Sequence, residues 1–305
     1  MKGLVIAGPT GVGKTDLSLK LAEKLKTEII SADSMQIYKG MDIGTAKIKP
    51  EETNGIKHYI IDIVFPDEDY SVGNFERDVN KILSEKEKNS ENIIIAGGTG
   101  LYINAVTDGI SELPEKDENL RKIFSEKTLE ELQKELYALD PESYNEIDIK
   151  NKVRVVRALE VCILSGKKFS VLKNKNIKRN NFNFLKVLLL RDRQELYDRI
   201  DRRVDLMMQE GLLEEVQALL AMGLPRNATA MQAIGYKEFL GVLDGTLTEQ
   251  EALELVKLRS RQYAKRQLTW LRRNPAIHWI YWEKDRDFAR ALQISTEILT
   301  ASGLG

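Results

Sequence analysis

Two residue types that build many active sites are scarce in this sequence of 305 residues. It has one cysteine, Cys162, and two histidines, His58 and His278. A single cysteine excludes a disulfide within the chain and a zinc site made of four cysteines, and it is typical of a reducing compartment. Two histidines far apart in sequence argue against a histidine metal site and against a Ser-His-Asp triad. We expect Cys162 and both histidines to serve packing rather than chemistry.

Long apolar segments and an excess of one charge are also missing. No apolar stretch approaches the roughly 20 residues of a membrane-spanning helix. Met1-Lys2-Gly3 leads directly into an expected strand, which leaves no room for a signal peptide. We therefore expect a cytoplasmic protein with no membrane partner. The net charge is only −1, with 46 lysines and arginines and 47 aspartates and glutamates, so a nucleic-acid partner can be indicated only by local clusters.

The first hundred residues alternate between strand and helix patterns. Apolar runs predict strands at 4–7, 28–31, 59–63 and 92–96. Amphipathic patterns predict helices at 15–25, at 72–87 with Ser71 as its cap, and at 101–107. This order is typical of an α/β fold with a parallel sheet, whose ligands bind at the carboxyl ends of the strands.

The second part of the chain is mainly helical. Helix patterns fill 115–166, and a basic, Asn-rich stretch at 167–183 is expected to be a loop. A strand at 185–190, helices at 193–222, 230–243 and 248–273, a strand at 277–282 and a terminal helix follow. With 42% hydrophobic residues the chain can bury a substantial core. We predict a P-loop NTPase-like core made of residues 1–114 and 184–305, with a helical C-terminal part, and an inserted helical subdomain at 115–183.

A phosphate-binding motif follows the first expected strand. It matches G-x-x-x-x-G-K-[ST] and consists of Gly8, Pro9, Thr10, Gly11, Val12, Gly13, Lys14 and Thr15. Small residues let successive N–H groups surround a phosphate at a helix N-terminus, Lys14 adds a positive charge, and the Thr15 hydroxyl can bind Mg²⁺. Most such loops hold ATP or GTP, but the motif reads phosphates and not what they are attached to.

Two more polar residues follow expected strands. Asp33 comes after the strand at 28–31, which lies beside the P-loop strand if the strand order is sequential. It could hold Mg²⁺ through water, accept a proton or cap a helix. Thr99, in Gly97-Gly98-Thr99, could donate a hydrogen bond into the cleft or cap the next helix. The strand before it ends in glycines where a P-loop NTPase normally has an acid, so Asp33 is the available acid or base.

Positive charge is concentrated in three acid-poor groups of residues. A solvated face is the usual explanation of one such group, but three in a chain of net charge −1 favour a phosphate-rich partner. The first lies on the late helix, the second is a pair in the expected insertion, and the third is in the 167–183 stretch. The groups are Lys257, Arg259, Arg261, Lys265, Arg266, Arg272 and Arg273; Arg154 and Arg157; and Lys167, Lys168, Lys173, Lys175, Lys178 and Arg179.

These motifs together resemble a known family. The segments GPTGVGKT, ISADSMQIYKGMDIGTAK, GGTGLY, RALEV, MQAIGYKE and RQYAKRQLTWLRR, in this order over nearly the full chain, resemble the bacterial tRNA dimethylallyltransferases. The resemblance implies transfer of a dimethylallyl group from dimethylallyl diphosphate to N6 of adenosine 37 in tRNA, giving N6-isopentenyladenosine and diphosphate. It implies Mg²⁺ as cofactor, a P-loop that holds the diphosphate and a tRNA anticodon stem-loop as partner. We expect the enzyme to act as a monomer.

The resemblance also implies roles for single residues. Asp33 is the implied general base, Thr10 helps to place Asp33 or the diphosphate, and Thr15 is the implied Mg²⁺ ligand. Contacts with the flipped-out adenosine are implied for Asp33, Ser34, Met35 and Gln36, and Thr99 is implied at the channel between core and insertion. Residues implied in tRNA binding are Arg121, Val153, Arg154, Val155, Val156, Arg157, Arg261, Lys265, Arg266 and Arg272. Gln232 stands where some relatives have an arginine.

Two other functions stay open from the residues alone. A small-molecule or nucleoside kinase would have the same P-loop, the same alternating start and a helical lid inserted in mid-chain. The missing acid after the strand at 92–96 and the late basic helix argue against it. An RNA-binding P-loop switch protein explains the basic clusters but leaves Asp33 without a role.

Overall fold

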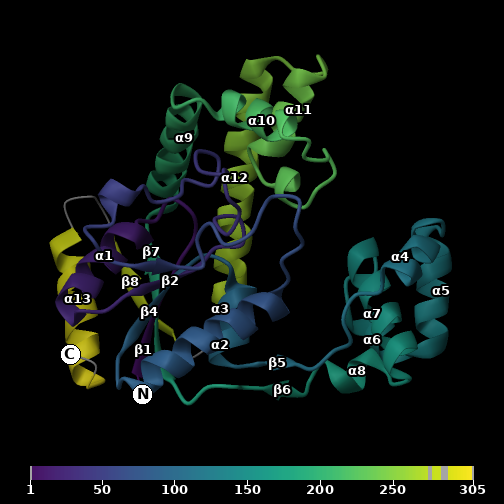
Figure 1. Ribbon diagram of the computed structural model, residues 1–305, viewed down its shortest axis with the longest axis horizontal. Coiled ribbons are helices and arrows are strands. Elements are labelled where there is room, and N and C mark those ends of the chain that lie inside the picture. Colours follow the sequence, from purple (N-terminus) through teal and green to yellow (C-terminus); the bar gives the residue numbers. More distant parts are fainter. Residues whose placement is uncertain (1, 274–276, 283–287, 304–305) are drawn as a thin grey trace. The chain divides into compact units, whose positions relative to one another are not determined.

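The computed structural model describes residues 2–273, 277–282 and 288–303. The chain forms two compact units, shown in Figure 1. Unit 1 consists of Met1–Thr107 and Asn180–Gly305, and unit 2 of Asp108–Arg179. The inserted unit therefore begins and ends a few residues earlier than the expected range of 115–183.

Unit 1 is built on a six-stranded sheet in the order β3-β2-β4-β1-β7-β8, and every neighbouring pair is parallel (Figure 1). The strands are β1 (Lys2–Ala7), β2 (Ile29–Ala32), β3 (His58–Tyr59), β4 (Ile93–Gly97), β7 (Asn183–Leu190) and β8 (Ile277–Tyr281). The predicted α/β core with a parallel sheet is confirmed. The strand order is not sequential: β4 lies between β1 and β2, so the strand before Asp33 is not the neighbour of the P-loop strand, and Thr99 follows the strand between them.

Helices cover both faces of this sheet. Helices α1 (Lys14–Leu25) and α13 (Phe288–Ala301) pack on one face, and α2 (Val72–Lys88) and α3 (Gly100–Thr107) pack on the other. Alternate residues of β1 therefore enter different cores: Leu4 and Ile6 pack with α1, and Val5 and Ala7 with α2 and α3. Two buried faces explain why β1 is apolar at successive positions rather than alternating with polar residues.

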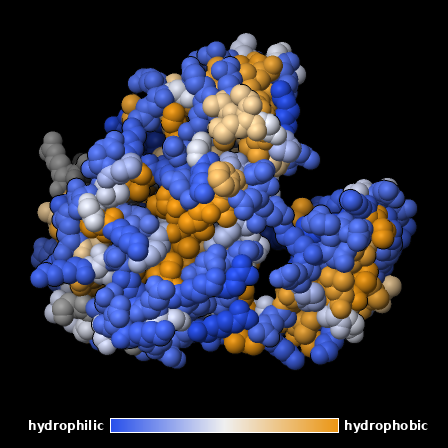
Figure 2. Space-filling model, viewed as in Figure 1, coloured by the Kyte–Doolittle hydropathy of each residue, from blue (hydrophilic) through white to orange (hydrophobic). Residues whose placement is uncertain are grey.

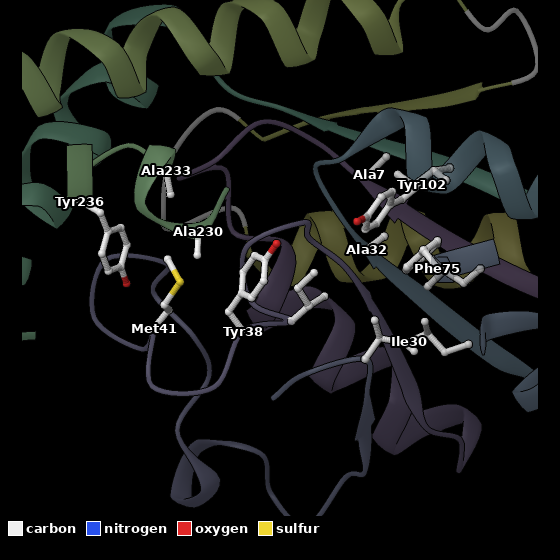
Figure 3. Packing of buried hydrophobic residues seen from close by; sticks show 14 of the residues in the cluster. Ala7, Ile30, Ala32, Tyr38, Met41, Phe75, Tyr102, Ala230, Ala233 and Tyr236 are labelled. Carbon is white, nitrogen blue, oxygen red and sulfur yellow. The ribbon is translucent and has the colours of Figure 1, made fainter. Parts of the chain in front are cut away.

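The core on the α2 side contains the aromatic contacts shown in Figure 3. Phe75 from α2 and Tyr102 from α3 stack with ring centroids 4.1 Å apart. Ser71 caps α2, as predicted, by accepting a hydrogen bond from the backbone N–H of Asn74. Tyr38 and Tyr236 lie in another part of the same cluster, near Met41. This part of the core supports the segment that follows Asp33.

The remaining helices of unit 1 are α9 (Arg193–Gln209), α10 (Leu212–Ala221), α11 (Tyr236–Leu243) and α12 (Glu249–Leu271), with short 3₁₀ turns η1 (Pro50–Glu52) and η2 (Ala230–Gln232). Two predicted helices are each divided in two. The break in 193–222 falls at Gly211 and the break in 230–243 at Gly235, where φ is 100° and 101°. Only glycine adopts such φ values without strain, and they end a right-handed helix.

The predicted strand at 59–63 is wrong beyond Tyr59. Ile60 and Asp62 have φ values of 62° and 55°, which are incompatible with a continuing strand. The backbone N–H groups of Asp62 and Ile63 instead donate to the carbonyls of Gln36 and Ile37. The segment thus leaves the sheet and pairs with the chain that follows Asp33.

Unit 2 contains α4 (Glu118–Ser125), α5 (Leu129–Leu139), α6 (Pro141–Glu146), α7 (Lys152–Ser165) and α8 (Phe169–Leu172). Strands β5 (Ile110–Ser111) and β6 (Asn176–Ile177) pair antiparallel. The stretch at 167–183 is therefore not only loop, because it contains α8, β6 and the start of β7. Leucines of α5 and α7 form the core with Phe124 and Val155. On the face of unit 2 seen in Figure 2, apolar residues also reach the surface.

The described helices do not have the character of membrane-spanning segments. Within residues 2–273, 277–282 and 288–303, none combines the length and the apolar content that crossing a bilayer requires.

Candidate active site

A pocket of about 400 Å³ lies in unit 1, where β1, β2 and β4 end. The P-loop residues Thr10, Lys14 and Thr15 line it together with Asp33 and Gly97. The three motifs that the sequence places after separate strands therefore meet at one edge of the sheet, as the parallel fold predicts. Helices α9 and α12 close the pocket with side chains that include Arg203, Tyr263 and Gln267.

The P-loop carbonyls are held by positively charged side chains. Lys14 Nζ donates to Pro9 O, Arg199 Nε to Gly11 O and Arg191 Nε to Val12 O, each at 2.9 Å. With these carbonyls paired, backbone N–H groups at the start of α1 are available to an anion, as in other phosphate-binding loops. Arg191 also stacks on Trp282, with its guanidinium carbon 4.0 Å from the ring centroid.

These arginines were missed by sequence reasoning. Arg191 and Arg199 lie at and after the end of β7, in a segment that resembles an ordinary charged helix. Their partners in the P-loop are more than 170 positions away, at separations of 179 and 188. No local pattern signals such a contact. The one available hint is that both follow the carboxyl end of a strand parallel to β1.

Lys14 has an unusual electrostatic environment. Burial lowers the pKa of its ammonium group to about 8, Asp33 acts in the opposite direction, and Arg203 lowers the pKa further. An anion bound beside Lys14 would favour the charged form. We therefore expect a bound phosphate to raise the pKa of Lys14 and to keep its ammonium group charged.

Asp33 lies at the turn that follows β2. Its Oδ1 accepts a hydrogen bond from the backbone N–H of Met35 at 2.9 Å, and its side chain lines the pocket. The next residue is fixed by Thr99, whose Oγ1 accepts from the backbone N–H of Ser34 at 3.1 Å. Thr99 thus anchors the Asp33 turn from the neighbouring strand, a role that the sequence did not suggest.

Helix α12 explains the glycines around Thr99. A Cβ on Gly98 would lie 2.1 Å from Gln267 Nε2, and one on Gly100 would lie 2.0 Å from the Trp270 ring. Gln267 uses both ends of its amide: Oε1 accepts from the backbone N–H of Thr10 at 2.9 Å, and Nε2 donates to Gly98 O at 3.0 Å. Sequence reasoning missed Gln267, which joins the P-loop to the loop after β4.

The segment after Asp33 is fixed by one carboxylate. Glu215 on α10 accepts from the backbone N–H groups of Asp42, Ile43 and Gly44 at 2.8, 2.8 and 3.1 Å. It also accepts from the hydroxyl of Tyr236, which burial and the nearby Glu215 keep protonated by raising its pKa. Figure 3 shows Tyr236 beside Met41 at this segment. Within it, Gln36 Nε2 donates to the carbonyls of Thr45 and Ala46.

Comparison with known proteins assigns the family. Residues 36–274 match the model of a family described as IPP transferase. The chain belongs to the IPP transferase family. It is 50% identical over 278 residues, 91% of each chain, to the tRNA dimethylallyltransferase of Fusobacterium nucleatum. It is 46% identical over 284 residues, 90% of each chain, to that of Clostridioides difficile. The resemblance stated from the motifs is confirmed.

Solved structures of IPP transferases agree with the fold. The full-length tRNA isopentenylpyrophosphate transferase from Bacillus halodurans superimposes with a TM-score of 0.73 at 38% identity, covering 99% of this chain and 98% of that one. A eukaryotic dimethylallyltransferase described as acting on tRNA gives a TM-score of 0.83 at 29% identity, covering 99% of this chain and 80% of that one.

The cations that the sequence analysis predicted to bind RNA are of two kinds in this structure: some form ion pairs with acids of the chain, and others are exposed. On α12, Arg261 pairs with Asp201, and Lys257 pairs with Asp205 at 2.7 Å. Both acids come from α9, so the acid-free part of α12, residues 257–271, is partly neutralised by the neighbouring helix. The cations further along α12 and at its end, Lys265, Arg266 and Arg272, are exposed.

In unit 2 the suggested residues also differ among themselves. Arg121 and Arg157 both pair with the buried Glu160. Val155 is fully buried in the core of unit 2, so its side chain is not available to RNA and that prediction is corrected. Val156 is partly buried, whereas Val153 and Arg154 are exposed on α7.

Proposed function

We propose that the chain transfers a dimethylallyl group from dimethylallyl diphosphate to N6 of adenosine 37 in tRNA, giving N6-isopentenyladenosine and diphosphate. One observation carries this proposal: a single pocket holds both a phosphate-binding loop and the carboxylate of Asp33. The family supports the same reaction, because the relatives compared above carry the name tRNA dimethylallyltransferase.

The carboxylate answers the main chemical difficulty of the reaction. The N6 amine of adenine is a poor nucleophile because its lone pair is delocalised into the ring. Asp33 accepts the N6 proton as the new N–C bond forms, and a positioned base of this kind contributes about 10²–10⁴-fold. The adenine must leave the stack of RNA bases to enter the pocket, and this costs least free energy when the adenosine lies in a loop. Ser34, Met35 and Gln36 line the pocket beside Asp33 and are proposed to contact the adenosine.

The P-loop supports departure of the diphosphate. Backbone N–H groups at the start of α1 and the Lys14 ammonium bind its oxygens. The residues present also fit Mg²⁺. The Thr15 hydroxyl is an oxygen donor and lines the pocket at the end of the loop that would hold the phosphates. Such a site is typical of Mg²⁺ bound mainly by phosphate oxygens and water, with Thr15 as the protein ligand. When bound, the ion would neutralise charge on the diphosphate.

The exposed cations are proposed to hold the tRNA. Lys265, Arg266 and Arg272 belong to unit 1, and Arg154 to unit 2, which we propose as the tRNA-binding insertion. Three further cations are held in ion pairs and are proposed to contact RNA with their remaining N–H groups: Arg121 and Arg157 of unit 2 and Arg261 of unit 1. The described residues that line the pocket all come from unit 1, so we propose that the site functions within one copy of the chain and that the enzyme acts as a monomer in the cytoplasm.

The test of this function is direct. The protein is incubated with labelled dimethylallyl diphosphate, Mg²⁺ and unmodified tRNA, and label in the RNA is measured after digestion to nucleosides. We expect labelled N6-isopentenyladenosine. ATP turnover without transfer of label would instead support a kinase, and tRNA binding without either activity would support an RNA-binding switch protein.

Asp33→Asn tests the proposed base. The amide keeps an oxygen for the N–H of Met35, so the turn should remain, but the group can no longer accept the N6 proton. We expect the rate of transfer to fall about 10²–10⁴-fold with tRNA affinity nearly unchanged, measured by single-turnover kinetics and filter binding. The exposed Asp67→Asn is the matched control and should keep the wild-type rate. A wild-type rate for Asp33→Asn would remove Asp33 from the mechanism.

A further inference from the structure

One wall of the pocket is a turn that belongs to no helix or strand. Gly44, Thr45 and Ala46 line the pocket in succession and form what we call the 44–46 wall. Ala46 has a φ of 46°, a left-handed conformation that is unfavourable for a residue with a Cβ. The wall therefore needs contacts from elsewhere in the chain to keep its shape.

These contacts come from Glu215 on α10, which is not among the described residues that line the pocket. Its Oε2 accepts hydrogen bonds from the backbone N–H groups of Asp42 and Ile43, both at 2.8 Å. Its Oε1 accepts from the backbone N–H of Gly44 at 3.1 Å and from the hydroxyl of Tyr236. A carboxylate has about four acceptor sites, so Glu215 uses all of them to hold the start of the wall.

Tyr236 lets the wall approach this carboxylate closely. Its ring is fully buried and lies beside Met41, which precedes the three N–H groups in the chain (Figure 3). A Cβ on Gly44 would lie 2.5 Å from the Tyr236 ring, so a residue with a side chain could not stand here without displacing the ring. The wall and its support therefore fit each other without spare space.

The wall is connected to the reacting side of the pocket through Gln36. Gln36 Nε2 donates to the carbonyls of Thr45 and Ala46, each at 3.3 Å, and its Oε1 accepts from the Ser31 hydroxyl at 3.1 Å. Ser31 belongs to β2, the strand that leads into Asp33. A displacement of the wall would therefore move the Gln36 amide and loosen its contact with the strand that carries Asp33.

We propose that Glu215 is a positioning residue of the transfer reaction: it holds the 44–46 wall so that Gln36 and Asp33 meet the adenosine in the required geometry. Glu215 contacts neither substrate and acts through the backbone of the wall. The P-loop is held by other side chains, among them Gln267 and Arg199. Loss of Glu215 should therefore slow transfer without weakening binding of a diphosphate. The inference rests on the proposed function, because it concerns the transfer step.

Glu215→Gln is the direct test. The amide keeps one acceptor oxygen but places an NH₂ group where a backbone N–H needs an acceptor. We expect the single-turnover rate at saturating tRNA to fall by about 10²-fold, as a displacement of about 1 Å in an active site can cause. The affinity for inorganic pyrophosphate, measured by calorimetry on the whole protein, should not change. Glu214→Gln is the matched control and should keep the wild-type rate, because Glu214 is exposed and lies in the same first turn of α10.

Two further variants separate the carboxylate from the packing around it. Glu215→Asp keeps the charge but is one methylene shorter, so its rate should lie between those of Glu215→Gln and wild type. Tyr236→Phe removes only the hydroxyl and leaves the three N–H groups bonded, so its rate should fall by about fivefold or less. A rate for Tyr236→Phe as low as that for Glu215→Gln would show that packing of α11 holds the wall, and it would overturn the inference.

Amide hydrogen exchange gives a measurement that does not depend on turnover. In Glu215→Gln we expect faster exchange in peptides that cover 38–47 and wild-type exchange in peptides that cover the P-loop. A wild-type transfer rate in folded Glu215→Gln overturns the inference, and so does a lower rate without faster exchange at 38–47. An equal loss of pyrophosphate affinity would indicate general damage and overturns it too. If the wild-type protein transfers no label to tRNA, the proposed function fails, and the exchange at 38–47 alone decides whether Glu215 holds the wall.

Discussion

At the scale of single residues, Gln267 links two of the loops that form the site, the P-loop and the loop after β4. Its amide joins Thr10 N–H to Gly98 O, and its side chain is buried. Gln267→Glu keeps the acceptor but loses the donor to Gly98 and adds a negative charge at the P-loop. We expect the free energy of unfolding to fall by about 1–3 kcal/mol and pyrophosphate affinity to fall as well. Urea unfolding and calorimetry measure the two effects.

The control for this change lies on the same helix. Gln262 is exposed on α12, and Gln262→Glu should change the free energy of unfolding by less than about 0.5 kcal/mol. Equal effects of the two substitutions would mean that Gln267 is not a specific link. Residues of this kind could not be predicted from sequence: the P-loop is local and readable, but Gln267 contacts Thr10 across 257 positions.

At the scale of elements, the sequence predicts type better than arrangement. Apolar runs locate β1, β2 and β4, and the three motifs after them do meet in one pocket. The insertion of β4 between β1 and β2 is set by long-range pairing, which no local pattern records. Gly211 and Gly235 interrupt the predicted helices because they adopt positive φ and stand immediately before α10 and α11. The sequence does not show this, because a glycine can also occur inside a helix. The strand at 59–63 fails because its N–H groups bond to the Asp33 segment instead.

In unit 2, one buried acid joins two helices. Glu160 on α7 is fully buried and accepts from Arg121 on α4, from Arg157 and from the backbone N–H of Asp117. Burial raises the pKa of this carboxyl, but the hydrogen bonds from Arg121, Asp117 and Arg157 outweigh it and lower the pKa to about 2. A depressed pKa means that this contribution to stability is complete above about 4.5, the ordinary value, and is lost as the pH falls toward 2.

Glu160→Gln should therefore destabilise the protein near neutral pH. Removing one partner of a buried ion pair costs about 3–5 kcal/mol, and we expect the lower end because both arginines are partly exposed. The loss of stability between pH 4.5 and 2 should also be smaller in the variant than in wild type.

The control is Glu130→Gln, which breaks an exposed ion pair with Lys134 and should lower the free energy of unfolding by less than about 0.5 kcal/mol. Urea unfolding monitored across pH measures both, and similar costs for the two variants would contradict this role of Glu160.

At the scale of the whole molecule, the cations fall into two groups: those in internal ion pairs and those exposed to solvent. The net charge of −1 does not distinguish these two groups. Lys257 and Arg261 are neutralised by acids of α9, whereas Lys265 is exposed. Internal pairs stabilise the fold and are poorly placed to release counterions on RNA binding. The exposed set, divided between the two units, is the part of the charge that a tRNA would read.

This division predicts how salt should affect tRNA binding. Arg154→Ala in unit 2 and Lys265→Ala in unit 1 each remove an exposed cation. Each should weaken binding and reduce the slope of log K against log[salt] by about 0.7–0.9, the contribution of one phosphate contact. Because the two residues belong to different units, their effects should add in the double variant. Lys20→Ala, which removes a surface cation that is paired with Glu23, should leave the slope unchanged. If Arg154→Ala and Lys265→Ala leave the slope at its wild-type value while Lys20→Ala alters it, the tRNA does not bind through the exposed cations of α7 and α12.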